Sequence, residues 1–129
     1  GAHVGVICDA GAPTFMLTHW TRDRTRGPGL PLEFLVHKHT HGNALAYGLS
    51  DRGLLAPGYK ADINVIDYDG LRLKAPQVVY DLPAGGRRLV QESVGYRHTF
   101  VSGTETRCND AFTGELPGKL IRGEQKTPG

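Results

Sequence analysis

The sequence contains few cysteines, no long apolar run and no large excess of charge of one sign. Its two cysteines, Cys8 and Cys108, lie far apart and form no CxxC pair, which excludes the disulfide framework of a small secreted scaffold and favours a reducing cytoplasm. No apolar stretch approaches the roughly 20 residues that cross a bilayer, and the first residues lack the basic region of a signal peptide. Neither membrane insertion nor export is expected.

The charge pattern gives little support to a nucleic-acid partner. The chain has 129 residues with 15 basic and 13 acidic side chains, a formal net charge of +2. Its longest basic cluster, Arg22, Arg24 and Arg26, is interrupted by Asp23. Such clusters more often form a solvated face or cap the end of a helix than a nucleic-acid surface. The charge pattern therefore predicts no nucleic-acid partner. The length of the chain predicts a single globular domain.

Residues 1–47 have the pattern of helices. Pro13 can open a helix at its first turn, and Phe15, Met16 and Trp20 fall on one stripe until residues 27–29 end it. A second helix is expected after Pro31. We predict that Gly42-Asn43 interrupts this second helix and that a short turn resumes through residues 44–47.

Residues 48–113 have the pattern of short strands. Apolar residues alternate with polar ones in residues 61–67, where a strand is expected. Further strands are predicted at residues 78–80, 88–92, 98–101 and 105–108, with a hairpin turn at Ser102-Gly103. Residues 114–129 are predicted to be an irregular or frayed tail. Helices followed by strands indicate an α+β arrangement.

Four segments carry a resemblance to a known family. Residues 48–67, GLSDRGLLAPGYKADINVID, are similar to the segment that leads amidohydrolase-superfamily chains from their barrel into a small β domain. Residues 1–24, 81–103 and 112–123 resemble the N-acyl-D-amino-acid deacylase, or D-aminoacylase-like, branch. The resemblance implies the last helices of a TIM-type barrel in residues 1–47, strands of a small β-sandwich domain in residues 48–113, and the tail in residues 114–129.

The same resemblance implies a zinc-dependent hydrolase of N-acyl-D-amino acids or related amides. In that family the metal ligands and the catalytic aspartate precede the segment that opens this sequence. We therefore expect no catalytic residue, no metal ligand and no activity in this chain alone. The expected partners are a missing N-terminal barrel segment, a small-molecule substrate and a second copy in a homodimer. The alternative is a detached β-domain module with a binding role.

Three residues are candidates for substrate binding. His3 follows the position of the catalytic aspartate, so the resemblance implies that it lies at the mouth of the barrel, where active sites collect. Asp9 could orient His3, although capping the next helix is the favoured interpretation. Arg22 could bind a substrate carboxylate in a bidentate manner, although a surface ion pair at a helix end is the favoured interpretation.

The remaining candidates have mainly structural interpretations. The run His37, His39 and His41 suggests a metal site, but on a helix only the first and last of these share a face, and a third ligand is not evident. A surface or packing role is therefore favoured over adventitious metal binding. Cys8 lacks a neighbouring histidine base and is predicted to be a core thiol.

Overall fold

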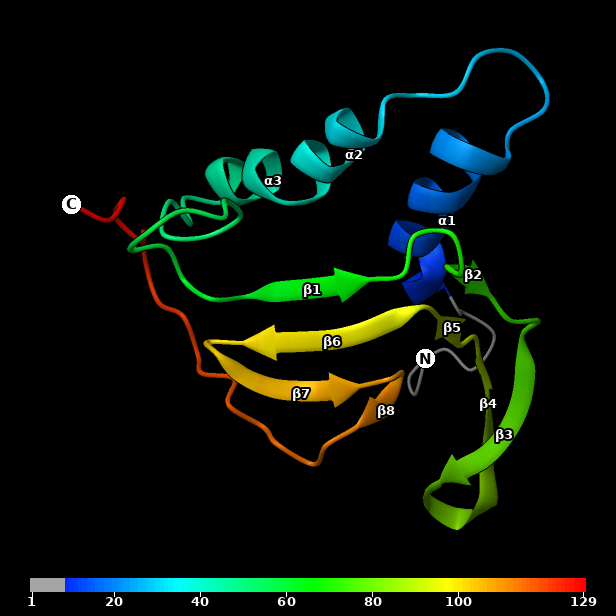
Figure 1. Ribbon diagram of the computed structural model, residues 1–129. Helices are drawn as coiled ribbons and strands as arrows, with labels where there is room; N and C mark the ends of the chain where they lie inside the picture. The colour runs from blue at the N-terminus through cyan, green and yellow to red at the C-terminus, as the bar shows by residue number, and fades with distance from the viewer. Residues whose placement is uncertain (1–8) are drawn as a thin grey trace.

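The computed structural model describes residues 9–129, in which a helical layer precedes and partly covers a set of short antiparallel strands (Figure 1). The helical part consists of η1 (Asp9–Gly11), α1 (Ala12–Thr18), the π-helical turn η2 (His19–Asp23), α2 (Leu32–His39) and α3 (His41–Ala46). The strands are β1 (Ile63–Ile66), β2 (Arg72–Leu73), β3 (Gln77–Leu82), β4 (Gly86–Val90), β5 (Ser93–Val94), β6 (Tyr96–Val101), β7 (Thr104–Cys108) and β8 (Ala111–Phe112). A 3₁₀ turn, Pro83–Gly85, joins β3 to β4. None of the described helices is long and apolar enough to cross a membrane.

The prolines begin the helices as predicted, but the second helix breaks at a different residue. Pro13 lies in the first turn of α1, and Pro31 is the N-cap of α2. The break falls at Thr40, whose backbone leaves the helical region at φ −116° and ψ −94° and whose hydroxyl donates to the Val36 carbonyl at 2.7 Å. The predicted interruption at Gly42-Asn43 is wrong, because both residues lie inside α3. Gly42 instead allows α3 to approach the end of α2 closely, since a Cβ there would meet the backbone oxygen of His37 at 3.2 Å.

The buried face of α1 is polar, not aromatic. Thr14 and Thr18 are buried, whereas Phe15 on the predicted stripe is 45% exposed. The Thr18 hydroxyl donates to the Thr14 carbonyl at 3.0 Å, and the Thr14 hydroxyl forms a 2.7 Å hydrogen bond with the Tyr96 hydroxyl of β6. Threonine hydroxyls can be buried here because each has a hydrogen-bond partner. Phe15 is therefore not part of the core that the described residues form.

Within residues 9–129, three antiparallel sheets follow the helices. One has four strands in the order β1-β6-β7-β8, and the other two pair β2 with β5 and β3 with β4. The five predicted strands are confirmed in β1, β3, β4, β6 and β7, whereas β2, β5 and β8 have two residues each, too few to show an alternating pattern. Ser102 and Gly103, at φ +52° and +80°, form the predicted hairpin turn between β6 and β7. The chain thus combines helices and strands, as expected.

The C-terminal tail is irregular but is attached to the end of α3. Residues 114–129 contain no helix and no extended strand pair, as predicted. However, Gln125 donates its backbone N–H to the Gly48 carbonyl at 2.8 Å and accepts a 2.9 Å hydrogen bond from the N–H of Ser50. These two bonds form a parallel bridge between Leu49 and Gln125. The tail is therefore held at this point and is not frayed there.

The described residues form a small apolar core. Leu35, Ala44 and Leu71 are its buried hydrophobic residues, and Leu71 is fully buried. Many large apolar side chains remain exposed on the helices and the tail. Burial of apolar surface is the main favourable contribution to folding, so this core makes a limited contribution to stability.

Asp67, which follows β1, provides a pH-dependent contribution to stability. The backbone N–H of Gly70 at 3.1 Å, and then Arg97 at 2.6 Å, stabilise its carboxylate and lower its pKa below the ordinary value. A lowered folded-state pKa stabilises the fold above the unfolded pKa, and this stability is lost as pH falls through the folded value. We expect Arg97→Gln to raise the Asp67 pKa, measured by NMR titration. Lys74→Gln, which removes the separate exposed ion pair with Glu92, is the control that should leave it unchanged.

Candidate functional site

The N-terminal helices carry two of the three predicted substrate-binding residues. His3 lies outside the described residues, as does Cys8. Asp9 is exposed at the start of η1, and the N-cap position of α1 is occupied by Gly11 without a side-chain hydrogen bond. Asp9 therefore does not cap α1, which was the alternative to a substrate role. The proposed roles of His3 and Asp9 stay predictions.

Arg22 connects the end of the first helical segment to the loop before β2. Its guanidinium donates to both carboxylate oxygens of Asp23, at 2.6 and 3.0 Å, and this hydrogen bonding lowers the pKa of Asp23. It also donates to the carbonyls of Tyr68, Asp69 at 3.2 Å and Leu71 at 2.8 Å. A substrate carboxylate would have to displace these partners. The ion pair considered as an alternative is present, and carboxylate binding by Arg22 stays a prediction.

The histidine run spans the break between α2 and α3. His37 and His39 belong to α2, and His41 is the first residue of α3. The rings of His37 and His41 lie on the same side, with centroids 5.8 Å apart, as helical spacing predicts. The buried Nδ1 of His41 has no hydrogen-bond partner among the described residues. No third metal-ligating side chain joins this pair in residues 9–129.

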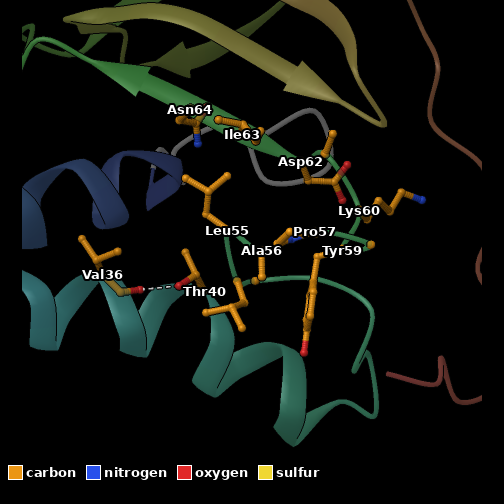
Figure 2. Close-up of a pocket in the computed structure, with 14 residues that line it drawn as sticks. Val36, Thr40, Leu55, Ala56, Pro57, Tyr59, Lys60, Asp62, Ile63 and Asn64 are labelled. Atoms are coloured by element: carbon orange, nitrogen blue, oxygen red, sulfur yellow. Dashed lines mark hydrogen bonds between the residues drawn. The ribbon is translucent and has the colours of Figure 1, made fainter. Parts of the chain in front are cut away.

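A hollow of about 510 Å³ lies between α2 and the first strand (Figure 2). Residues 53–64 form most of its wall, and Val36 of α2 and Thr40, which follows α2, complete it. Leu55 and Tyr59 contribute apolar surface, whereas Lys60 and Asp62 lie at one side. The hollow does not include Asp9, Arg22 or any histidine. It therefore offers a place for an apolar group but no recognisable catalytic arrangement.

A further group of side chains was not predicted from the sequence. His98 on β6 and Glu105 and Cys108 on β7 place one potential ligand atom each within 4.8 Å of one another. Among the described residues, no other group of three or more histidine, cysteine and acidic side chains lies close enough to share a metal ion. A hairpin spanning His98 and Cys108 was predictable, but the strand irregularity that gathers the three side chains was not.

The comparison with known proteins establishes the family. The model of the amidohydrolase family matches residues 2–106, so this chain belongs to the amidohydrolase family. It is 34% identical over 107 residues to the D-aminoacylase of Alcaligenes xylosoxydans xylosoxydans, which covers 82% of this chain and 19% of that protein. It is also 37% identical over 90 residues to adenine deaminase 1 of Rhizobium meliloti (strain 1021), covering 60% of this chain and 16% of that protein.

A solved structure gives the same result. The chain superimposes on a crystal structure of D-aminoacylase with a TM-score of 0.57 and 30% sequence identity, over 80% of this chain and 19% of that chain. The resemblance to a D-aminoacylase-like amidohydrolase is thereby confirmed. The chain spans about a fifth of the length of these relatives.

The described residues do not fit the catalytic zinc site that the resemblance implies. That site needs at least three convergent ligands and an open position for water. The helical segment, to which the resemblance assigns the end of the barrel, supplies only the pair His37 and His41. The group His98, Glu105 and Cys108 lies on the β6–β7 hairpin, in the segment that the resemblance assigns to the accompanying β domain and not to the barrel. No catalytic step can therefore be assigned to residues 9–129.

Proposed function

We propose that this chain is the C-terminal part of a metal-dependent amidohydrolase that hydrolyses the amide bond of N-acyl-D-amino acids. Similarity to D-aminoacylase in both sequence and structure supports this substrate class. In this proposal residues 1–47 complete the barrel, residues 48–113 belong to the accompanying β domain, and an upstream segment supplies the zinc ligands. The parent enzyme is proposed to be cytoplasmic, in keeping with the two separated cysteines of this chain.

The exposed area of the chain carries this proposal. Its accessible surface is 9151 Å², whereas a compact monomer of 14.0 kDa exposes roughly 6,700 Å². The difference is comparable to what a large permanent interface buries. Part of the exposed apolar surface lies on the helical layer, on Phe15, Phe34, Val36, Leu45 and Tyr47. A barrel segment packed against α1, α2 and α3 would cover this surface.

The same surface explains the expected behaviour of the chain by itself. Exposed apolar patches of this kind promote association, and the short strands leave unpaired edges. We therefore expect the isolated chain to form homodimers through its helical layer. A detached module with a binding role would instead be a folded, soluble monomer by itself.

The test of this function is to combine two separately produced parts. The 129-residue chain is expected to be inactive by itself, and mixing it with the upstream segment of its own protein should restore hydrolysis of N-acetyl-D-amino acids. N-acetyl-L-amino acids and adenine serve as competing substrates, because one relative is an adenine deaminase. Release of ammonia from adenine would overturn the substrate class. Turnover by the 129-residue chain alone would overturn the proposal that an upstream segment supplies the zinc ligands.

Matched variants test the docking surface. Phe34→Glu introduces a charge on α2, where the side chain is 47% exposed, and should greatly reduce the recovered activity. Leu116→Glu places the same charge on the tail, where the side chain is 93% exposed, and should leave it unchanged. Equal recovery with both variants would show that the helical layer is not the surface that docks.

A further inference from the structure

An irregularity in the β6–β7 hairpin brings three side chains to one face. In a regular strand, residues three apart point to opposite faces, so Glu105 and Cys108 should point apart. The pairing register shifts within this hairpin: Thr99 lies opposite Arg107, but the next residue of β6 lies opposite Glu105. Thr106 is therefore an extra residue, as in a β-bulge. The bulge returns Glu105 to the face of Cys108.

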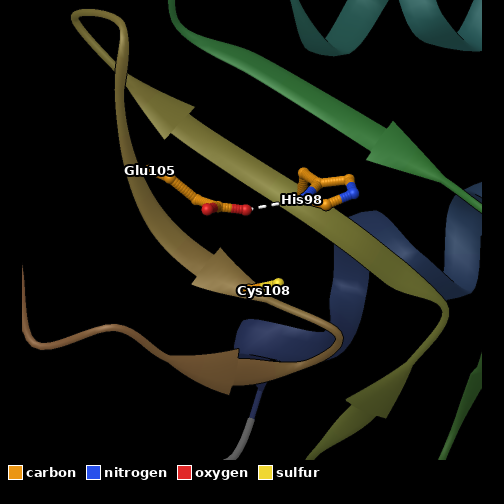
Figure 3. A group of neighbouring side chains, drawn as sticks. All are labelled: His98, Glu105 and Cys108. Carbon is orange, nitrogen blue, oxygen red and sulfur yellow. Dashed lines mark hydrogen bonds and ion pairs between the residues drawn. The ribbon is translucent and has the colours of Figure 1, made fainter.

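The third member of this face comes from the neighbouring strand. His98 lies directly opposite Cys108 in the β6–β7 pairing. Its Nδ1 is 2.6 Å from Oε1 of Glu105, and the ligand atoms of all three side chains lie within 4.8 Å of one another (Figure 3). The His98 and Glu105 side chains are 43% and 34% exposed, so ions from solvent can reach them.

We propose that His98, Glu105 and Cys108 bind a zinc-class divalent transition-metal ion. Tetrahedral coordination with bonds of about 2.0–2.3 Å places ligand atoms roughly 3.3–3.8 Å apart. To reach these separations, the Glu105 carboxylate would rotate away from Nδ1 of His98, now 2.6 Å away, and the ligand atoms that lie up to 4.8 Å apart would move closer. On binding, the Cys108 thiol releases its proton to solvent and coordinates as thiolate. Water completes the coordination.

The donor set determines which ions fit. Thiolate and imidazole favour zinc, cobalt, nickel and copper, whereas magnesium and calcium require oxygen ligands. Because the ligands come from β6 and β7, the ion would crosslink the hairpin and stabilise the folded state. This site is distinct from the catalytic zinc site proposed for the upstream segment. It departs from the expectation that this chain contains no metal ligand.

The sequence provides a direct test, because it contains a second cysteine as a matched control. Cobalt(II) is added to metal-free 129-residue chain, and thiolate-to-cobalt charge-transfer absorption reports a Co–S bond. We expect the band in the unmodified chain and in Cys8→Ser, and its loss in Cys108→Ser. His98→Gln should weaken binding by more than the roughly 10- to 100-fold that changes to outer-shell partners cause. The double variant His37→Gln/His41→Gln should bind as the unmodified chain does.

Each outcome is decisive. Absence of the band in the unmodified chain, or its loss in Cys8→Ser, overturns the site. Unchanged affinity in His98→Gln would also overturn the site. Loss of binding in the double histidine variant would overturn it as well. Metal-free melting temperatures of all variants show whether they fold alike, and Glu105→Gln provides a further substitution that leaves both cysteines in place. Because no readout depends on hydrolysis, failure of this site leaves the proposed function intact.

Discussion

Replacement of Gly53 by alanine is expected to lower the free energy of unfolding by about 3 kcal/mol or more. Gly53 has φ +82°, which an alanine adopts at a cost of roughly 1–2 kcal/mol. Its Cβ would also lie 2.8 Å from Cα and 2.9 Å from the backbone N of His41. These backbone atoms begin α3 and cannot rotate aside as a side chain can. The alanine can therefore be accommodated only if the loop that contains Gly53 moves away from the start of α3.

Gly85→Ala is the matched control for this prediction. Gly85 has a similar φ of +70°, but a Cβ there would meet nothing within 4 Å. Its substitution should therefore cost only the conformational term, roughly 1–2 kcal/mol. Urea unfolding followed by circular dichroism measures both variants. Equal decreases in the free energy of unfolding would show that the contact between residue 53 and the start of α3 does not add to the cost of the Gly53 substitution.

The second large effect is expected for Leu71→Ala. Leu71 is fully buried, and its neighbours are held close: its carbonyl accepts from Arg22 at 2.8 Å, and a Cβ on Gly95 would meet its Cα at 2.8 Å. Removal of a buried leucine side chain costs about 2–5 kcal/mol, because apolar contacts are lost and a cavity remains. Since the described core is small, this loss should leave much of the chain unfolded at room temperature.

Leu120→Ala is the control, because it makes the same leucine-to-alanine change at an exposed position. Leu120 is 77% exposed in the irregular tail, so its truncation should change the free energy of unfolding by no more than about 0.5 kcal/mol. The same urea titration compares the two variants. A small effect of Leu71→Ala would mean that the apolar core does not hold the loop before β2 against the helices.

Local features of the fold were predictable because they depend on neighbouring residues. Proline limits its own backbone and therefore begins α1 and α2 where Pro13 and Pro31 predict. The hairpin at Ser102-Gly103 was predictable from Gly103, because glycine adopts positive φ without steric cost. Strands of two residues, such as β2 and β5, have no pattern of their own. They form because the tertiary structure brings β2 and β5 side by side, where they pair with each other.

The candidate sites were less predictable than the fold. Helical spacing placed His37 and His41 together, and the structure agrees. The partners of Arg22 in the loop of residues 68–71 could not be anticipated, because they lie more than 40 positions away along the chain. Nor could the face shared by Glu105 and Cys108, since an alternating pattern places them on opposite sides.

The sequence by itself determined that helices precede strands, where the five longer strands and the Ser102-Gly103 turn lie, and the membership of the amidohydrolase family. These properties depend on residue types at short spacing, which a linear pattern records. Tertiary structure alone decided that Thr14 and not Phe15 is buried, that Gly53 packs against His41, and that a bulge at Thr106 gathers three metal-ligating side chains. Each of these results depends on contacts between segments distant in the chain or on pairing register, and no local pattern specifies either.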